Sequence, residues 1–414
     1  MVIMVNIDRL IVTLDALNQY GADRQGRGIT RLAYTKIYEE AMLEFVQMCK
    51  QIDLDVQLDA FGNVIARREG RLADLPAVAF GSHMDTVNNG GEYDGILGVV
   101  AGLEVMRSLH EEGVQTRHPL ELIVFACEES SRFGVSTLGS KAMTGLLDHY
   151  AVSNLRDKNG VTIQQAFREA GLDFDRIREA VRTPKQLKTF LELHIEQGPL
   201  LEMERKFIGI VTGIASPTRL QVHVKGKASH SGTTPMIGRQ DALAAAAEII
   251  LEVERSAREE TEYGTVGTVG VCTVLPGAMN VIPDSVILQI DVRGTSEPSK
   301  NTILDTLFRL FRRLEEQRGV IVEPAILNVE RPVLLQNEVV DILTECCENQ
   351  QVSYRHMVSG AGHDSMNMAA LCPTGLIFIP CREGLSHHPD EYASRESIEA
   401  GTRVLKEAVL RFAE

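Results

Sequence analysis

The chain has 414 residues, 44% of them hydrophobic and 24% charged, and 42 basic against 57 acidic residues give a formal net charge of −15. Such a length exceeds the size at which one hydrophobic core normally keeps growing, so we expect two domains. The acidic balance and the lack of any Lys or Arg cluster exclude nucleic acid as an expected partner. No apolar run approaches the ~18 residues of a membrane span, and no signal-peptide pattern opens the chain, so we expect a cytoplasmic protein without a membrane partner.

The first half of the chain and its end predict an α/β fold with a mainly parallel sheet. Four short apolar runs are expected as strands: Ala77–Phe80, Leu122–Ala126, Phe190–Leu193 and Leu376–Ile379. Three of them are typical of buried parallel strands, whereas the third alternates around Glu192. Helical patterns lie between these runs, for example over 38–52 and 97–109. Alternating strands and helices favour a parallel sheet covered by helices.

The stretch from about 218 to 330 has a different pattern. It predicts strand, helix, two strands, helix and strand over 219–224, 241–259, 267–274, 285–292, 300–317 and 320–324. This order is that of an α+β ferredoxin-like unit. We therefore predict a catalytic α/β domain over 1–215 and 330–414, with an inserted lid or dimerisation domain over 216–329.

The seven cysteines are scattered and show no Cys-x-x-Cys spacing. This usage predicts reduced thiols rather than disulfides or a thiolate metal site. Cys127 stands directly before two glutamates, where a thiolate is disfavoured, so we interpret it as a packed strand residue rather than a nucleophile.

A polar cluster follows each of the four apolar runs directly. The clusters are GSHMDTVNNGGEYDG, CEESSRFG, HIEQG and CREGLSHHPDE, in chain order. Ligands of open α/β sheets collect at the carboxyl ends of the strands, so four separate segments are expected to meet at one place.

The donors in these clusters are imidazoles and carboxylates. They are His83, Asp85, Asp94, Glu128, Glu129, His194 and either His387 or His388. Such a set suits Zn, Mn or Co. It also exceeds what one tetrahedral ion needs, which favours two divalent ions sharing a carboxylate. Each segment alone is more often a structural element, but four at equivalent strand ends indicate a site.

Eight segments spread over nearly the whole length carry a family resemblance: GRGITRLAY, GSHMDTVNNGGEYDG, CEESSRFG, ELHIEQGPLLE, ASHSGTTPM, PGAMNVIPD, SGAGHDSMN and GLSHHPDE. They resemble the co-catalytic metallopeptidase and amidohydrolase family. Within it they resemble the branch of N-carbamoyl-L-amino-acid hydrolases, allantoate amidohydrolases and β-ureidopropionases. ELHIEQG looks like this branch, since relatives that are true peptidases often carry Asp at the position of His194.

The resemblance implies a role for each metal-site residue. His83, Asp94 and His194 would hold one ion, and Asp94, Glu129 and His387 the other. Asp85 would accept the imidazole N–H of His83 and fix its tautomer. Glu128 would be the general base. The exchanged assignment, with Glu128 as ligand and Glu129 as base, stays open, because adjacent side chains at a strand end point opposite ways and only one is expected to be a ligand.

Further residues match substrate-binding positions of the branch: Gln197, His230, Asn280, Arg293, Gly360 and Ala361. Arg293 offers a planar fork for a carboxylate, with an internal ion pair to Asp291 as the alternative. His230 would stabilise the developing oxyanion. Gly360 and Ala361 would contact the substrate through their backbone, with His363 and Asp364 in support.

The implied activity is hydrolysis of the C–N bond of an N-carbamoyl-L-amino acid or related ureido acid, a small-molecule substrate, with release of ammonia and carbon dioxide. Allantoate hydrolysis is the alternative within the branch. A di- or aminopeptidase, and a binding protein that kept the fold but lost the reaction, are the alternatives outside it. The resemblance also implies a homodimer formed through the inserted domain, with the His230 loop reaching the partner's metal site.

Overall fold

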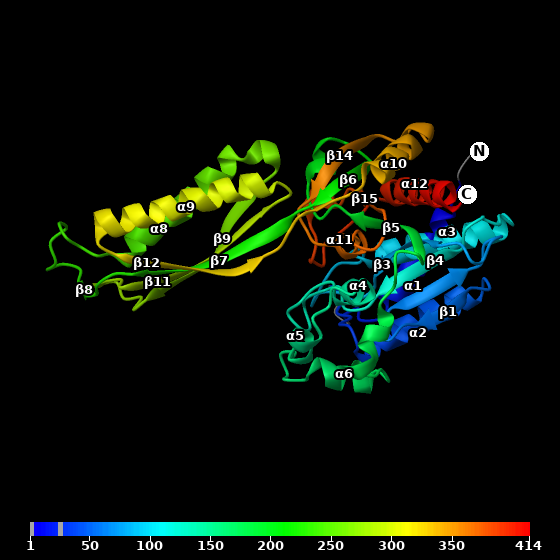
Figure 1. Ribbon diagram of the computed structural model, residues 1–414, viewed down its shortest axis with the longest axis horizontal. Coiled ribbons are helices and arrows are strands. Elements are labelled where there is room, and N and C mark those ends of the chain that lie inside the picture. Colours follow the sequence, from blue (N-terminus) through cyan, green and yellow to red (C-terminus); the bar gives the residue numbers. More distant parts are fainter. Residues whose placement is uncertain (1–3, 24–27) are drawn as a thin grey trace. The chain divides into compact units, whose positions relative to one another are not determined.

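The structure is a computed structural model that describes residues 4–23 and 28–414 (Figure 1). The first two residues of the GRGITRLAY segment lie outside these ranges. The chain divides into two compact units. The first comprises the described residues up to Thr212 together with Leu335–Met357 and Gly362–Glu414, and the second comprises Gly213–Leu334 and Val358–Ala361.

The larger sheet, most of whose strands belong to the first unit, is parallel in its middle and antiparallel at its edges. Its strands follow the order β1-β2-β4-β3-β5-β15-β6-β13, and β14 pairs with β6. Their bounds are Asp55–Leu58 (β1), Val64–Arg68 (β2), Leu120–Phe125 (β4), Ala77–His83 (β3), Leu187–Ile195 (β5), Thr374–Ile379 (β15), Ile208–Ile214 (β6), Val333–Leu334 (β13) and Tyr354–Ser359 (β14). The strands β4, β3, β5 and β15 run parallel, so their carboxyl ends lie at one edge. The predicted largely parallel sheet is confirmed.

Helices cover both faces of this sheet (Figure 1). One face packs against α1 (Ile7–Asn18), α2 (Lys36–Lys50), α3 (Ile96–Glu111), α10 (Asn337–Asn349) and α12 (Arg395–Ala413). The other face carries α4 (Leu138–Met143) and α11 (Asp364–Met368), with α6 (Ile163–Glu169) and the 3-10 helix Phe174–Ala180 beyond α4. Short helices also span His149–Ser153 (α5) and Leu200–Met203 (α7). Alternate residues of β3 serve the two cores: Val78 and Phe80 join one, and Ala77 and Ala79 the other.

The alternation predicted around Glu192 does not separate a buried face from an exposed one. All residues of β5 except Lys188 are buried, and Glu192 itself has no exposed surface. Its carboxylate accepts hydrogen bonds from the Ser82 hydroxyl (2.8 Å) and from both the amide (3.0 Å) and the hydroxyl (2.7 Å) of Ser365. These donors satisfy a charge that burial would otherwise make costly.

Arg31 anchors the loop that follows β3 to the end of α1. It is fully buried, and its guanidinium donates to the carbonyls of Met84 (2.6 Å), Leu17 (3.0 Å) and Tyr20 (2.9 Å). Its backbone N–H donates to the Thr86 hydroxyl (2.8 Å). The chain on both sides of Asp85 is therefore fixed by one side chain and its backbone.

The second unit is a four-stranded antiparallel sheet with two helices on one face (Figure 1). Its elements in chain order are β7 (Ser216–Lys225), α8 (Ala242–Glu259), β9 (Val266–Leu275), β11 (Ser285–Gly294), α9 (Glu297–Arg318) and β12 (Ile321–Val329). The sheet order β12-β7-β11-β9 is the ferredoxin-like order. Apolar residues of β7 and β11 pack under both helices, and a small ladder of β8 (Ser229–His230) with β10 (Val281–Ile282) holds the adjoining loop.

Within the described residues no helix is both long and apolar enough to cross a membrane. The seven cysteines are all free.

Candidate metal centre

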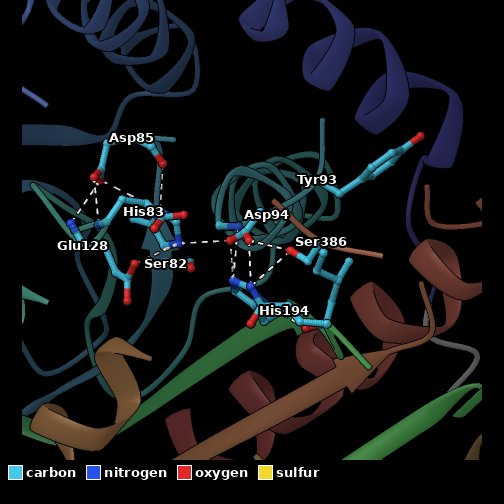
Figure 2. Close-up of polar contacts among 12 residues, drawn as sticks. Ser82, His83, Asp85, Tyr93, Asp94, Glu128, His194 and Ser386 are labelled. Atoms are coloured by element: carbon cyan, nitrogen blue, oxygen red, sulfur yellow. Dashed lines mark hydrogen bonds and ion pairs between the residues drawn. The ribbon is translucent and has the colours of Figure 1, made fainter. Parts of the chain in front are cut away.

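The carboxyl ends of the four parallel strands bring the donor residues of the first unit together. His83 ends β3 and His194 lies near the end of β5, while Glu128 and Glu129 follow β4 and His387 follows β15. Asp94 stands just before α3 and points between the two strand histidines (Figure 2). Gly95, with φ of 68°, makes this approach possible, because a Cβ there would lie 2.3 Å from the ring of His83.

His83, Asp94 and His194 form a buried group of three donors. The Nε2 atoms of His83 and His194 lie 3.4 Å and 3.1 Å from Asp94 Oδ1. The Nδ1 atom of each ring lies 2.9 Å from a main-chain carbonyl, that of Asp85 or Ile195. A carbonyl only accepts, so each Nδ1 carries a proton, and Nε2 is the atom of each ring that faces the Asp94 carboxylate and can bind a metal ion.

Asp94, Glu129 and His387 form a second group that shares Asp94 with the first. The Nε2 atom of His387 lies 3.2 Å from Asp94 Oδ2 and 3.3 Å from Glu129 Oε1. His388 instead pairs with Asp390 on the surface. Of the two candidate histidines, His387 is therefore the one at the cluster.

The donor set fits divalent cations. Ligands about 2.0–2.1 Å from a tetrahedral ion stand roughly 3.3 Å from one another, which matches the spacings given above. The pKa values of the histidines also indicate a site for positive charge. Burial lowers the pKa of His83, but Glu128, Asp94 and Asp85 outweigh it and raise that pKa well above its ordinary value. Hydrogen bonds to Asp94 and Glu129 raise the pKa of His387 to about 11. The cluster thus attracts positive charge, whether carried by protons or by metal ions.

Glu128 lies beside the first group without belonging to either. Its Oε2 atom is 3.7 Å from His83 Nε2, and burial raises its pKa well above the ordinary range. The expectation that the two glutamates alternate as in a strand is wrong, because β4 ends at Phe125 and Cys127 turns the chain with φ of 58°. Cys127 is buried as predicted, with a pKa raised well above its usual value by burial, but it belongs to this turn rather than to the strand.

The prediction that the Asp85 carboxylate accepts the imidazole proton of His83 is wrong. The main-chain carbonyl of Asp85 accepts it, and the carboxylate stands 3.8 Å from Nδ1. The carboxylate accepts instead the backbone N–H groups of Glu128 (3.1 Å) and Glu129 (2.9 Å), as Figure 2 shows in part. The left-handed turn at Cys127 aims both amides at Asp85. One residue therefore fixes the tautomer of His83 and the orientation of the glutamate pair.

Gln197 touches the shared carboxylate directly. Its Nε2 donates to Asp94 Oδ2 (2.7 Å), and its buried Oε1 has no hydrogen-bond partner among the described residues. Ser386 and Glu391, which the sequence reasoning missed, complete the surroundings of Asp94. The Ser386 hydroxyl lies 2.9 Å from Asp94 Oδ2, and Glu391 accepts the backbone N–H of Asp94 (3.0 Å). Both residues lie in the GLSHHPDE segment, so their closeness in sequence to His387 could have identified them as candidates.

The remaining residues predicted to contact the substrate belong to the second unit, whereas His363 and Asp364 belong to the first. Arg293 makes the ion pair that was the alternative interpretation: Nε and Nη2 donate to the two carboxylate oxygens of Asp291 at 2.9 Å and 3.0 Å. Its Nη1 lies 3.5 Å from the carbonyl of Gly360, next to Ala361. Arg219 also donates to Asp291 (3.1 Å). The bonds to Asp291 and Gly360 use three of the five N–H groups of the Arg293 guanidinium and leave one on Nη1 and one on Nη2 for another acceptor.

His230 and Asn280 meet at the small ladder of this unit. His230 pairs with Val281, and the N–H of Ser231 donates to the Asn280 carbonyl (3.0 Å). Both side chains are exposed. The N–H of Gly232 donates to His230 Nδ1 (3.1 Å), which places the proton of the neutral ring on Nε2. The exposed Nε2–H of His230 is therefore a hydrogen-bond donor.

Known proteins resemble the chain over nearly its full length. It is 46% identical to a Haemophilus influenzae protein described as an uncharacterized hydrolase, over 93% of this chain and 94% of that one. It is 40% identical to an N-carbamoyl-L-amino-acid amidohydrolase of Paenarthrobacter aurescens, over 96% of each. A ureidoglycolate hydrolase of Oryza sativa (37%, over 98% and 85%) and an allantoate amidohydrolase of Bacillus subtilis (35%, over 97% and 96%) also match.

The fold comparison and the family model agree with these relatives. A crystal structure of an amidase of the hydantoinase/carbamoylase family from Burkholderia multivorans superposes with a TM-score of 0.92 at 34% identity, over 99% of this chain and 98% of that chain. The model described as peptidase family M20/M25/M40 matches residues 79–411. The predicted resemblance is confirmed, and the chain belongs to peptidase family M20/M25/M40.

Proposed function

We propose that this protein is a metal-dependent amidohydrolase that cleaves the C–N bond of an N-carbamoyl-L-amino acid or a related ureido acid. One water is consumed, and the amine, ammonia and carbon dioxide are released. The observation that carries the proposal is the pair of three-donor groups sharing Asp94, with the free carboxylate of Glu128 beside them. The names of the relatives support hydrolysis of a non-peptide C–N bond, in a family whose members are typically metal-dependent.

Two divalent ions, of Zn, Mn or Co, are proposed as cofactors. His83, Asp94 and His194 would hold one, and Asp94, Glu129 and His387 the other. When bound, such ions polarise a carbonyl and lower the pKa of water. The histidines of the first group support this assignment, because a main-chain carbonyl holds each Nδ1 proton and each Nε2 faces the Asp94 carboxylate. A metal ion at that place would replace the proton that the raised pKa of His83 favours.

Glu128 is proposed as the general base that takes a proton from the attacking water and returns it to the departing nitrogen. Its buried position raises its pKa and so strengthens it as the acceptor of the proton from water. Asp85 holds the turn that carries it. His230 is proposed to donate its Nε2–H to the oxyanion, with Asn280 and Gln197 also contacting the substrate.

The substrate's carboxylate is assigned to Arg293, with the backbone of Gly360 and Ala361 beside it. The ion pair to Asp291 supports this role, because it fixes the guanidinium plane and leaves one N–H on Nη1 and one on Nη2 for the substrate. A selectivity measurement distinguishes substrate binding from a purely structural role of Arg293.

An Arg293→Ala variant is expected to raise KM for substrates with a free carboxylate far more than for their amides. The lost charge-assisted contact is worth roughly 1.5–3 kcal/mol, or about 10- to 150-fold. Arg219→Ala is the matched control, because it also removes a donor from Asp291 but keeps Arg293 in place. Steady-state kinetics on both substrate types gives the comparison. Equal losses for acid and amide would assign Arg293 to structure alone.

A homodimer formed through the second unit is proposed, with the His230 loop of each chain serving the metal centre of its partner. The resemblance implies it. The edge strand β9 is long, ten residues, and exposes Val266, Val271 and Leu275 at 57%, 41% and 51%. An unpaired, apolar edge of this kind is suited to association with a second copy.

Chelation is expected to abolish activity, and added divalent metal to restore it. The reason is that all five proposed ligands are imidazoles and carboxylates, arranged in two groups that each suit a divalent cation. The measurement is activity and metal content after treatment with a chelator and after titration with Zn, Mn or Co. Full turnover by protein shown to be metal-free would contradict the two-metal assignment.

A direct assay identifies the class of substrate. Ammonia release from N-carbamoyl-L-amino acids, allantoate and β-ureido acids ranks the three classes on one scale. We expect the N-carbamoyl-L-amino acids to give the highest kcat/KM. A higher value for allantoate would favour the alternative within the branch, and inactivity toward all three would refute the proposed function.

A further inference from the structure

Glu391 holds the backbone of the shared ligand Asp94. It is 3% exposed, and its Oε1 atom accepts the consecutive N–H groups of Tyr93 (2.9 Å) and Asp94 (3.0 Å). Tyr93 and Asp94 lie side by side in Figure 2. Because both backbone N–H groups donate to the same oxygen, they fix the direction in which the chain enters α3. They thereby also fix the position of the Asp94 Cα–Cβ bond, from which the carboxylate extends.

The second oxygen of Glu391 reaches the side chain of Asp94 through Ser386. The Ser386 hydroxyl lies 2.9 Å from Glu391 Oε2 and 2.9 Å from Asp94 Oδ2. Ser386 directly precedes His387, a member of the second donor group. Glu391 therefore connects two segments almost 300 residues apart in the sequence, at the point where both supply donors to the same group.

The turn before Asp94 is shaped to admit this carboxylate. A Cβ built on Gly91 would lie 2.2 Å from Glu391 Oε1 and 2.3 Å from its carboxyl carbon. Any other residue at position 91 would displace Glu391 or the turn. The glycine at position 91 thus leaves room for a buried carboxylate from the other end of the chain.

The two donor groups differ in how firmly their histidines are held. His83 and His194 are buried strand residues, each fixed by a bond from Nδ1 to a main-chain carbonyl. The side chain of His387 is 49% exposed and stands on a loop with φ of 56°. Loss of the Glu391 contacts should therefore disturb the second group far more than the first.

We propose that Glu391 is a positioning residue that holds Asp94 and the Ser386–His387 segment in the geometry that binds the ion of the second group. The proposal rests on the proposed function, in which two ions bind. The carboxylate of Glu391 accepts hydrogen bonds from the backbone N–H groups of Tyr93 and Asp94 and from the Ser386 hydroxyl. Residues of this kind commonly change metal affinity by about 10- to 100-fold.

The test is metal binding by the full-length protein, without an activity assay. Metal-free wild type, Glu391→Ala and Glu391→Gln are titrated with Zn, and the number of ions and both affinities are measured by calorimetry with a competing chelator. We expect two ions for wild type. In Glu391→Ala the tighter ion is kept, and the affinity for the second falls about 10- to 100-fold.

Glu391→Gln is expected to retain the wild-type affinity for both ions. Its amide oxygen can still accept from Tyr93 and Asp94, and its NH2 group can donate to Ser386. Glu121→Gln is the matched control, because Glu121 is an equally buried carboxylate of the same unit that pairs with Arg67 and Arg182. It is expected to lower stability and leave both metal affinities unchanged.

Each other outcome is decisive. Unchanged affinities in Glu391→Ala, equal losses of both ions, or the same loss in the Glu121→Gln control would overturn the positioning role. A loss in Glu391→Gln as large as in Glu391→Ala would show that charge rather than hydrogen bonding matters, which also contradicts the proposal. Wild-type protein that binds fewer than two ions would contradict the proposed function instead, so the two failures are distinguishable.

Discussion

A Glu128→Gln variant is expected to keep both metal ions and to lose at least about 10²-fold in kcat, the usual contribution of a positioned general base. The amide has the shape of the carboxylate but cannot take a proton from water. Glu128 lies outside both donor groups, 3.7 Å from His83, so its replacement removes no ligand. Steady-state kinetics together with the metal content of the purified variant gives both quantities.

Glu129→Gln is the control for this experiment, since the neighbouring carboxylate belongs to the second donor group. We expect this variant to lose affinity for one ion. If Glu128→Gln loses a metal and Glu129→Gln does not, the two roles are exchanged. Both residues donate their backbone N–H to the Asp85 carboxylate, so both variants keep the same backbone anchor.

Two inactive variants, His230→Ala and Glu128→Gln, are expected to restore activity when their chains are mixed in one dimer. His230→Ala alone should lose about 10²- to 10³-fold in kcat, the usual effect of removing one oxyanion donor. If His230 serves the partner's centre, a mixed dimer contains one pocket with an intact base from one chain and an intact His230 from the other. Neither parent dimer has such a pocket.

The expected recovery follows from the two-fold symmetry. Random exchange makes about half of the dimers mixed, each with one good site of two, so roughly a quarter of the wild-type activity should return. Co-expression or co-refolding followed by an ammonia assay gives the measurement. The absence of recovery in samples with demonstrated heterodimers would refute the shared site.

Much of the fold was predictable because hydrophobic periodicity is local. The four apolar runs became β3, β4, β5 and β15, and the Ala-rich stretch after Asp241 became α8, with Asp241 as its N-cap. Glu192 was the exception. Its burial depends on hydroxyl and amide donors from Ser82 and Ser365, which are distant in sequence. No window around residue 192 contains that information.

The residues that meet at the candidate centre could be predicted from their types and strand-end positions, but their hydrogen bonds could not. A carboxylate two residues from a histidine suggests a direct contact, yet the backbone of Asp85 takes that place and its carboxylate serves the glutamate pair. The left-handed turn at Cys127 directs those amides toward Asp85. It could not be predicted, because the residue with positive φ is not a glycine. Glu391 was missed because its partner segment lies at the other end of the chain.

Ammonia release from N-carbamoyl-L-amino acids, measured beside the hydrolysis of dipeptides with the same side chains, distinguishes an amidohydrolase from a peptidase. The measurement uses full-length protein loaded with Zn, Mn or Co. We expect stoichiometric ammonia and free amino acid from the carbamoyl and ureido substrates, and no cleavage of the dipeptides. Cleavage of dipeptides without ammonia release from any ureido acid would contradict this expectation and assign the two-metal centre to a peptidase.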